Sequence, residues 1–123
     1  MAQATDFVER YVALWNETDA KKRRAEIEAL WSPDGQHYTK AAAYNGYAEL
    51  EERVNRSYER SIAPGLNVFR HADNIDAHHN VIRFNWHMQR KATDEIMATG
   101  FEFLVLADDG RIRTDYQFID FSK

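Results

Sequence analysis

One carboxylate, Glu102, lies inside an otherwise apolar run at residues 100–106. A carboxylate in apolar surroundings is costly unless it is paired, hydrogen-bonded or protonated. Strand alternation places Glu102 on one face with Gly100, Leu104 and Leu106. If that face is interior, loss of hydration raises the pKa of Glu102 and makes it a candidate general acid or base. The alternative is an exposed or interface carboxylate that pairs with Arg83.

Two further polar side chains could take part in proton transfer. Tyr11 lies on the apolar face of a predicted helix, and its phenol could donate to negative charge that develops on a carbonyl oxygen. The alternative is a core tyrosine with a local hydrogen bond. His37 has an unperturbed pKa of about 6.5, which suits a general base, and alternation puts it on the same face as Thr39. The alternative is a partly exposed strand histidine.

Metal and cofactor chemistry have little support in the sequence. The chain has no cysteine, and its remaining histidines stand alone or adjacent in a turn, without the spacing of a metal site. It contains no Gly-rich phosphate loop and no dinucleotide fingerprint. We therefore expect neither a native metal nor a cofactor.

Three predicted helices precede the long strands. The first begins near Thr5 or Asp6 and carries an apolar stripe at helical spacing as far as Thr18. Asp19 is the predicted N-cap of the second helix, and the basic run at 21–24 indicates a solvated face or a site for an anionic partner. The third helix is predicted over 47–62, with apolar residues at every fourth position.

The rest of the chain reads as strands and turns. Residues 81–88 alternate, with Ile82, Phe84 and Trp86 on one face. The other predicted strands are 36–40, 66–70, 96–106 and 112–121, and the predicted turns or loops are 32–35, 41–46, 77–80 and 108–111. Helices followed by an antiparallel meander indicate an α+β fold, with the helices on one face of a curved sheet.

Composition limits the function classes. The 123 residues suit one domain over 1–123, and the aromatic residues, three Trp, six Tyr and seven Phe, suggest a well-filled core with an aromatic-lined cavity. A formal net charge of -4 and a pI near 5.7 argue against a nucleic-acid partner. No apolar run reaches the length of a membrane span, and the first residues do not resemble a signal peptide. We expect a cytoplasmic protein without a membrane partner.

Several strings, in this order, resemble the nuclear transport factor 2 superfamily, in its SnoaL-like and ketosteroid-isomerase-like branch. They are RYVA at 10–13, LWSPDG at 30–35, GYAEL at 46–50, RFNW at 83–86, GFEF at 100–103 and DGRI at 109–112. The resemblance covers nearly the whole chain. It implies a cone-shaped α+β fold, with three N-terminal helices packed against a strongly curved, mainly antiparallel sheet that encloses a pocket. It also implies a homodimer joined through the outer sheet face.

The same resemblance implies roles for individual residues. In the isomerase-like branch, an acid eight positions before the hairpin glycine points into the pocket, and Glu102 has that spacing to Gly110. Tyr11 matches the oxyanion-binding tyrosine. The base aspartate of these isomerases is replaced by Thr39, which cannot abstract a carbon-bound proton at neutral pH, and His37 is the nearby substitute.

The function expected from the sequence is the binding of a small, largely apolar molecule. In one hypothesis the protein is an isomerase, cyclase or dehydratase with Glu102 as acid, Tyr11 as oxyanion donor and His37 as base. In another it is a non-catalytic carrier or sensor, and in a third it is a protein-interaction module with a filled pocket. The expected ligand contacts are Trp15, Trp31, Thr39, Tyr58, Phe84, Trp86 and Phe118.

Overall fold

The structure, a computed structural model that describes residues 2–123, begins with helices. They are α1 (Ala2–Asn16), α2 (Ala20–Leu30) and α3 (Gly46–Ser57), and the last continues into a π-helical turn, η1 (Tyr58–Ile62). Because α1 already begins at Ala2, Thr5 and Asp6 lie inside it and do not cap it, contrary to the prediction. Asp19 is confirmed as the N-cap of α2, since its side chain accepts the backbone N–H of Lys21 at 2.8 Å.

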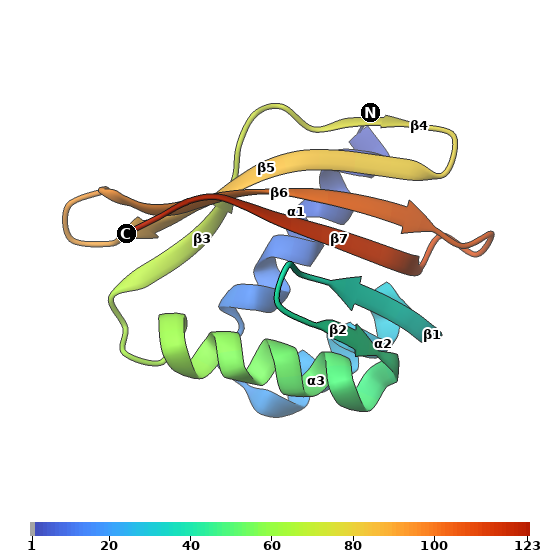
Figure 1. Ribbon diagram of the computed structural model, residues 1–123, viewed down its shortest axis with the longest axis horizontal. Coiled ribbons are helices and arrows are strands. Elements are labelled where there is room, and N and C mark those ends of the chain that lie inside the picture. Colours follow the sequence, from blue (N-terminus) through green and yellow to red (C-terminus); the bar gives the residue numbers. More distant parts are fainter. Residues whose placement is uncertain (1) are drawn as a thin grey trace.

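The strands form one seven-stranded mixed sheet (Figure 1). They are β1 (Trp31–Tyr38), β2 (Ala43–Asn45), β3 (Asn67–His71), β4 (Asp76–His78), β5 (Val81–Arg90), β6 (Ile96–Leu106) and β7 (Ile112–Ser122). The order is β2-β1-β7-β6-β5-β3, with β4 paired to β5. All described pairs are antiparallel except β1 and β7, which run parallel. The α+β class and the mainly antiparallel sheet are thus confirmed.

Three segments that read as turns or loops contain strand pairing. The predicted turn at 32–35 lies inside β1, whose pairing with β7 shifts between Trp31 and Gln36. Such an irregularity in the pairing accommodates Pro33 and Gly35, the two residues that favoured a turn in the sequence. A Cβ on Gly35 would lie only 2.7 Å from the Trp31 side chain, so the close packing here requires glycine. The short strand β2 lies within the predicted loop 41–46, and β4 overlaps the start of the predicted turn 77–80. Strands of three residues are too short to show an alternating pattern in the sequence.

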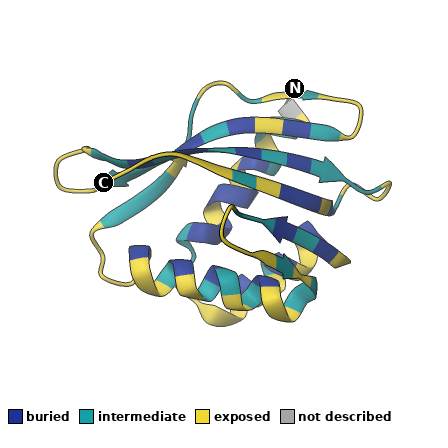
Figure 2. Ribbon diagram, viewed as in Figure 1, coloured by how far each residue is buried: buried dark blue, intermediate teal, exposed yellow. Residues whose placement is uncertain are grey.

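The helices and the inner sheet face enclose the core. In Figure 1, α1 crosses behind the long strands, while α3 lies beside β1 and β2. The inward residues of β5, Ile82, Phe84 and Trp86, are buried as predicted, and the banded colouring of β5 and β6 in Figure 2 follows this alternation. The β6–β7 register shifts twice, and such bulges bend a sheet.

Among the described helices, none combines the length and the apolarity that crossing a bilayer requires.

Candidate functional site

A cavity of about 400 Å³ lies between α1, the α3–η1 segment and the inner face of the sheet. Its apolar wall includes Trp15, Phe69, Phe84, Trp86 and Met88. Its polar wall includes Tyr11 from α1, Arg53 from α3, Arg60 from η1, Glu102 from β6 and Gln117 from β7. This volume and this mixture of many apolar and few polar side chains are typical of small-molecule sites.

The acidic end of the cavity is a buried hydrogen-bonded cluster. Trp86 Nε1 donates to Glu102 Oε1 at 3.0 Å, and Glu102 Oε2 lies 3.2 Å from the Tyr11 hydroxyl oxygen. The Tyr11 hydroxyl lies 2.5 Å from Asp115 Oδ2, which is also 2.8 Å from His37 Nδ1. All of these side chains are nine-tenths or more buried. The cluster therefore forms a continuous chain from the cavity to the buried His37.

Strand register explains how the sequence assembles this cluster. Asp115 on β7 is the direct parallel partner of His37 on β1, which brings these two side chains together. Glu102 on β6 lies opposite Phe84 on β5, one diagonal position from Trp86. Gly100 lies opposite Trp86, and a Cβ there would clash with the indole ring. The glycine therefore leaves the space in which the indole reaches Glu102.

The distances favour one direction for the hydrogen bonds of the cluster. The Tyr11 hydroxyl carries one proton, so it donates fully to only one of its two carboxyl neighbours. The 2.5 Å distance to Asp115 Oδ2, against 3.2 Å to Glu102 Oε2, favours donation to Asp115. A protonated Glu102 would complete the remaining contact by donating to the phenol oxygen.

The electrostatic environment agrees with this assignment. Burial, and then the charge of Asp115, raise the pKa of Glu102 well above its ordinary value. Burial would also raise the pKa of Asp115, but the charge of His37 and the hydrogen bonds from its neighbours outweigh it and lower that pKa. Burial and the two acids raise the pKa of Tyr11. These directions favour Glu102 as the protonated member of the two acids, Asp115 as the carboxylate and Tyr11 as a neutral hydroxyl.

Comparison of the sequence with protein-family models and with curated proteins finds no match. Solved structures do match. A proposed isomerase of the SnoaL-like family from Agrobacterium tumefaciens has a TM-score of 0.88 at 23% identity, over 98% of this chain and 100% of that one. A SnoaL-like protein of unknown function from Burkholderia thailandensis has a TM-score of 0.75 at 12% identity, over 98% of both chains.

A proposed polyketide cyclase from Sinorhizobium meliloti also matches, with a TM-score of 0.69 at 13% identity, over 92% of this chain and 94% of that one. The chain has the NTF2-like fold of the SnoaL-like proteins. The sheet of this NTF2-like chain is open: β2 and β3 lie at its two ends and do not pair with each other. Because one fold hosts many chemistries, the likeness fixes the architecture and leaves the activity to be argued from the site.

Within the NTF2-like fold, the residues expected to carry chemistry lie close together. Glu102 faces the interior and lines the cavity, and the alternative partner Arg83 instead lies 3.7 Å from Asp76. Tyr11 also lines the cavity. His37 is fully buried but lies behind Asp115, outside the cavity wall. A base role for His37 on a bound molecule would therefore have to act through Asp115 and Tyr11.

Asp115 was missed by the sequence analysis. Uninterrupted alternation along β7 from the buried Ile112 would place Asp115 outside and Phe118 inside. The register shift between Val105 and Leu106 reverses this phase, so that Asp115 and Gln117 face inward. A bulge of this kind depends on the partner strand and leaves no signal in β7 alone.

Four of the expected ligand contacts lie outside the cavity wall. Trp15, Phe84 and Trp86 do line the cavity, as expected. Phe118 points outward because of the bulge and is 56% exposed, beside Phe101. Trp31 is completely buried, and its ring centroid lies 5.7 Å from that of Tyr11.

The other two are engaged elsewhere. The Thr39 hydroxyl accepts the backbone N–H of Ala42 at 3.1 Å in the turn after β1, so Thr39 cannot occupy the position of a pocket base. The Arg23 guanidinium lies 4.0 Å from the ring centroid of Tyr58, which places that ring against α2 and not in the cavity.

The structure also brings together a set of groups that could ligate a metal. His37, Glu102 and Asp115 each offer an atom, and these atoms lie within 4.8 Å of one another. The sequence analysis missed this set because its members come from three different strands, and His37 on β1 lies far from the other two in the chain. His37 and Asp115 are bonded to each other, so they would bind an ion only after giving up that hydrogen bond. Within residues 2–123, His37 Nε2 and Asp115 Oδ1 are buried without a hydrogen-bond partner.

Proposed function

We propose that this protein binds a small, largely apolar molecule in the cavity and donates a proton or a short hydrogen bond to an oxygen atom of that molecule. The observation that carries the proposal is the position of Glu102. Its buried carboxyl group forms part of the cavity wall and is hydrogen-bonded to Trp86 and Tyr11. A buried neutral acid beside a neutral phenol suits the stabilisation of negative charge on a carbonyl oxygen.

The polar wall favours acid chemistry over base chemistry. Among the described residues that line the cavity, Glu102 is the only carboxylic acid, and the other ionisable wall residues are Tyr11, Arg53 and Arg60. Since Thr39 lies in a turn, the base position of the isomerases is not supplied from there. The proposed role is therefore the acid half of isomerase, cyclase or dehydratase chemistry, in which a carbonyl or leaving hydroxyl oxygen is protonated.

The buried chain behind Glu102 can stabilise the carboxylate that forms when Glu102 donates its proton. The Tyr11 hydroxyl can then turn and donate a hydrogen bond to Glu102, while His37 Nδ1–H remains the donor to Asp115. These changes only redirect hydrogen bonds, so Glu102 regains its proton from the bound molecule or from solvent at the end of the reaction. His37 would thus act as a positioning and charge-balancing residue, in place of the direct base that the sequence suggested.

A carbonyl probe tests this proposal without knowledge of the natural ligand. We expect 2-acetonaphthone to bind saturably, and the infrared stretch of its bound C=O to fall below that in hexane, because hydrogen bonds to the oxygen weaken the bond. The shift should shrink in Tyr11→Phe and in Glu102→Gln. Tyr116→Phe is the matched control, since Tyr116 is exposed on the outer face of β7.

Two results of this experiment would overturn the proposal. One is the absence of saturable binding to the folded wild-type chain. The other is a bound C=O frequency equal to that in hexane, or equal in the wild type and in both cavity variants. Binding with a shifted frequency but without any turnover of related carbonyl compounds would favour the carrier or sensor hypothesis over an enzyme.

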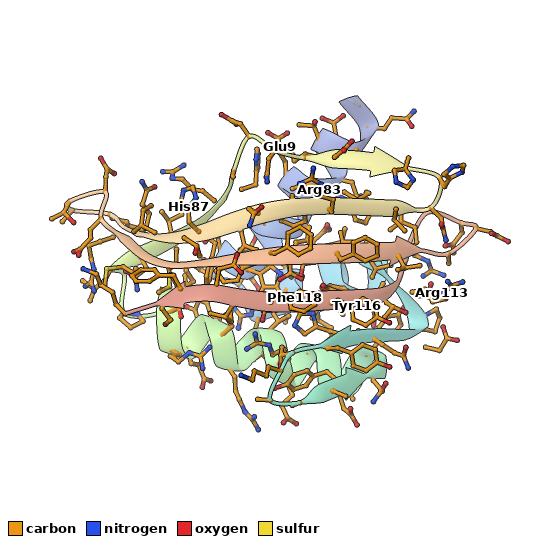
Figure 3. All side chains as sticks on the ribbon, turned by 45° about the horizontal axis from the view of Figure 1, so that its top comes forward. Glu9, Arg83, His87, Arg113, Tyr116 and Phe118 are labelled. Carbon is orange, nitrogen blue, oxygen red and sulfur yellow. The ribbon has the colours of Figure 1, made fainter. Side chains whose placement is uncertain are left out.

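We further propose that the outer face of the sheet joins two copies of the chain. Tyr116 and Phe118 lie along β7, as Figure 3 shows, and they are 40% and 56% exposed. The neighbouring ring of Phe101 packs against Phe118, and Tyr38 packs against Tyr116. Exposed aromatic side chains grouped in this way are typical of protein interfaces.

Phe118→Arg tests the outer-face dimer. We expect the wild type to sediment as a dimer and Phe118→Arg to sediment as a monomer, because the change places a charge in the apolar patch. The far-UV circular dichroism should stay unchanged, since Phe118 is not part of the core. Arg113→Ser, at an exposed position of the same strand, serves as the control. A monomeric wild type would contradict the proposed interface.

A further inference from the structure

We propose that the ligand of this cavity is a carboxylate: an apolar molecule whose anionic group is held by Arg53 and Arg60, on the polar wall that also carries Glu102 and Tyr11. This inference rests on the proposed function and adds the chemical class of the ligand. It is carried by two arginines that line the cavity without an acidic partner.

Arg53 is held in the wall by contacts that leave its charge unbalanced. Its Nη2 donates to Gln117 Oε1 at 2.9 Å, and its guanidinium lies 5.4 Å from the Trp15 ring centroid and 5.8 Å from that of Tyr44. Its Nε is buried and has no hydrogen-bond partner among residues 2–123. These contacts orient the guanidinium, but none of them supplies a negative charge.

Arg60 adds a second positive charge to the same wall. It follows Arg53 at a spacing of seven residues, which returns a helical side chain to the same face, and it is more exposed than Arg53. The buried Ser57 and Ser61 lie on this face as well, and both line the cavity. The wall therefore offers two guanidinium groups and two hydroxyl groups from a single helical segment.

The other arginines of the described chain do not line the cavity. Ion pairs with acidic side chains are formed by Arg10, Arg24, Arg56, Arg83 and Arg111. Among the described residues, Arg53 and Arg60 are the two arginines that both line the cavity and form no such pair. Burial lowers the pKa of Arg53 and the charge of Arg60 adds to this, while Tyr44, Tyr11 and Glu102 act in the opposite direction. A bound anion would relieve the repulsion between the two arginines and complete the hydrogen bonds of Arg53.

The polar wall of the cavity combines cationic and acidic groups. Gln117 lies between them, since its Oε1 accepts from Arg53 Nη2 and its side chain is also a hydrogen-bond neighbour of Glu102. A neutral ligand would leave Arg53 Nε unpaired. A carboxylate matches the fork of donors of a guanidinium, and the apolar wall takes the body of the molecule.

A pair of probes that differ only in charge tests this inference. The probes are 1-naphthylacetate and 1-naphthylacetamide, titrated into the whole chain by calorimetry at neutral pH. We expect the acid to bind on the order of tenfold more tightly than the amide, because charge-assisted hydrogen bonds are stronger than neutral ones. Arg53→Gln and Arg60→Gln should each reduce this preference, and Arg53→Lys should retain part of it.

Arg56→Gln is the matched control, since Arg56 lies on α3 but pairs with Glu52 at the surface. It should keep the full preference for the acid. Equal binding of acid and amide to the wild type would overturn the inference, as would a preference that survives in both Arg53→Gln and Arg60→Gln. Absence of binding by either probe would also overturn it. The binding of 2-acetonaphthone decides separately whether the proposed function fails, because that ketone carries no charge.

Discussion

Glu102→Gln is expected to stabilise the folded protein at neutral pH while it removes the proposed proton donor. Burial and the Asp115 charge raise the pKa of Glu102 in the folded state, whereas the unfolded chain ionises near the reference value of about 4.3. Between these two pKa values the folded state binds more protons than the unfolded state. The stability of the wild type therefore falls as pH rises through this window, by up to about 1.4 kcal/mol per pH unit.

Glutamine removes this pH-dependent penalty, because it keeps an oxygen that can accept from Trp86 and an amide that can donate to Tyr11. Urea unfolding of both proteins, from acid to mildly alkaline pH, measures the difference. We expect nearly equal free energies of unfolding below a pH of about 4, and an advantage for Glu102→Gln that grows as pH rises.

The control for this series is Glu59→Gln, since Glu59 is exposed on η1. It should follow the wild type at every pH. A difference between wild type and Glu102→Gln that does not change with pH would mean that Glu102 titrates alike in the folded and unfolded states. The assignment of Glu102 as a buried neutral acid would then be wrong. A substitution that removes a functional group and also stabilises the fold is typical of a site that is kept for function at the expense of stability.

Asp115→Ala is expected to lower the free energy of unfolding by about 2–6 kcal/mol, because it leaves the two buried groups Tyr11 and His37 without their hydrogen-bond partner, at about 1–3 kcal/mol each. Asp115 is fully buried and has contacts of 2.5 Å with Tyr11 and 2.8 Å with His37. Burial alone would raise its pKa, but His37 and the surrounding hydrogen bonds lower it. The stability that Asp115 contributes is thus present above its unfolded pKa of about 3.9 and is lost as pH falls through the folded pKa.

Denaturant unfolding at neutral pH measures this loss, with Asp120→Ala on the exposed side of β7 as the control. The double variant with His37→Ala should lose less stability than the sum of the two single variants, because removal of both partners leaves neither of them buried without the other. Additive losses, or a loss in Asp115→Ala no larger than in Asp120→Ala, would contradict the pairing of Asp115 with His37.

The parts of the site that could be predicted from sequence depend on local pattern. Glu102 interrupts an apolar strand and Tyr11 lies on an amphipathic helix, so local pattern singled out both side chains. For Glu102, the direction into the pocket was implied by the resemblance to the isomerase-like branch. The α+β order of helices and strands follows from the same periodicities. Asp19 was found as a helix cap because capping is also a local rule.

The parts that could not be predicted depend on contacts between distant segments. The β6–β7 bulge reverses the phase of β7, which turned Asp115 inward and Phe118 outward against expectation. The position of Thr39 outside the cavity depends on a turn in which its hydroxyl accepts the backbone N–H of Ala42. Arg53 carries no motif, and its place in the cavity emerges only when α3 packs beside the sheet.

The most direct test of the account is the ionisation state of Glu102 in the folded protein. Infrared difference spectroscopy between wild type and Glu102→Gln, at a series of pH values, isolates the C=O band of this one protonated carboxyl group. The account predicts that the band is present at neutral pH and disappears only at a pH far above the reference pKa of about 4.3. A band that vanishes near that reference value would show an ionised Glu102 at neutral pH and would contradict the proposed proton donor.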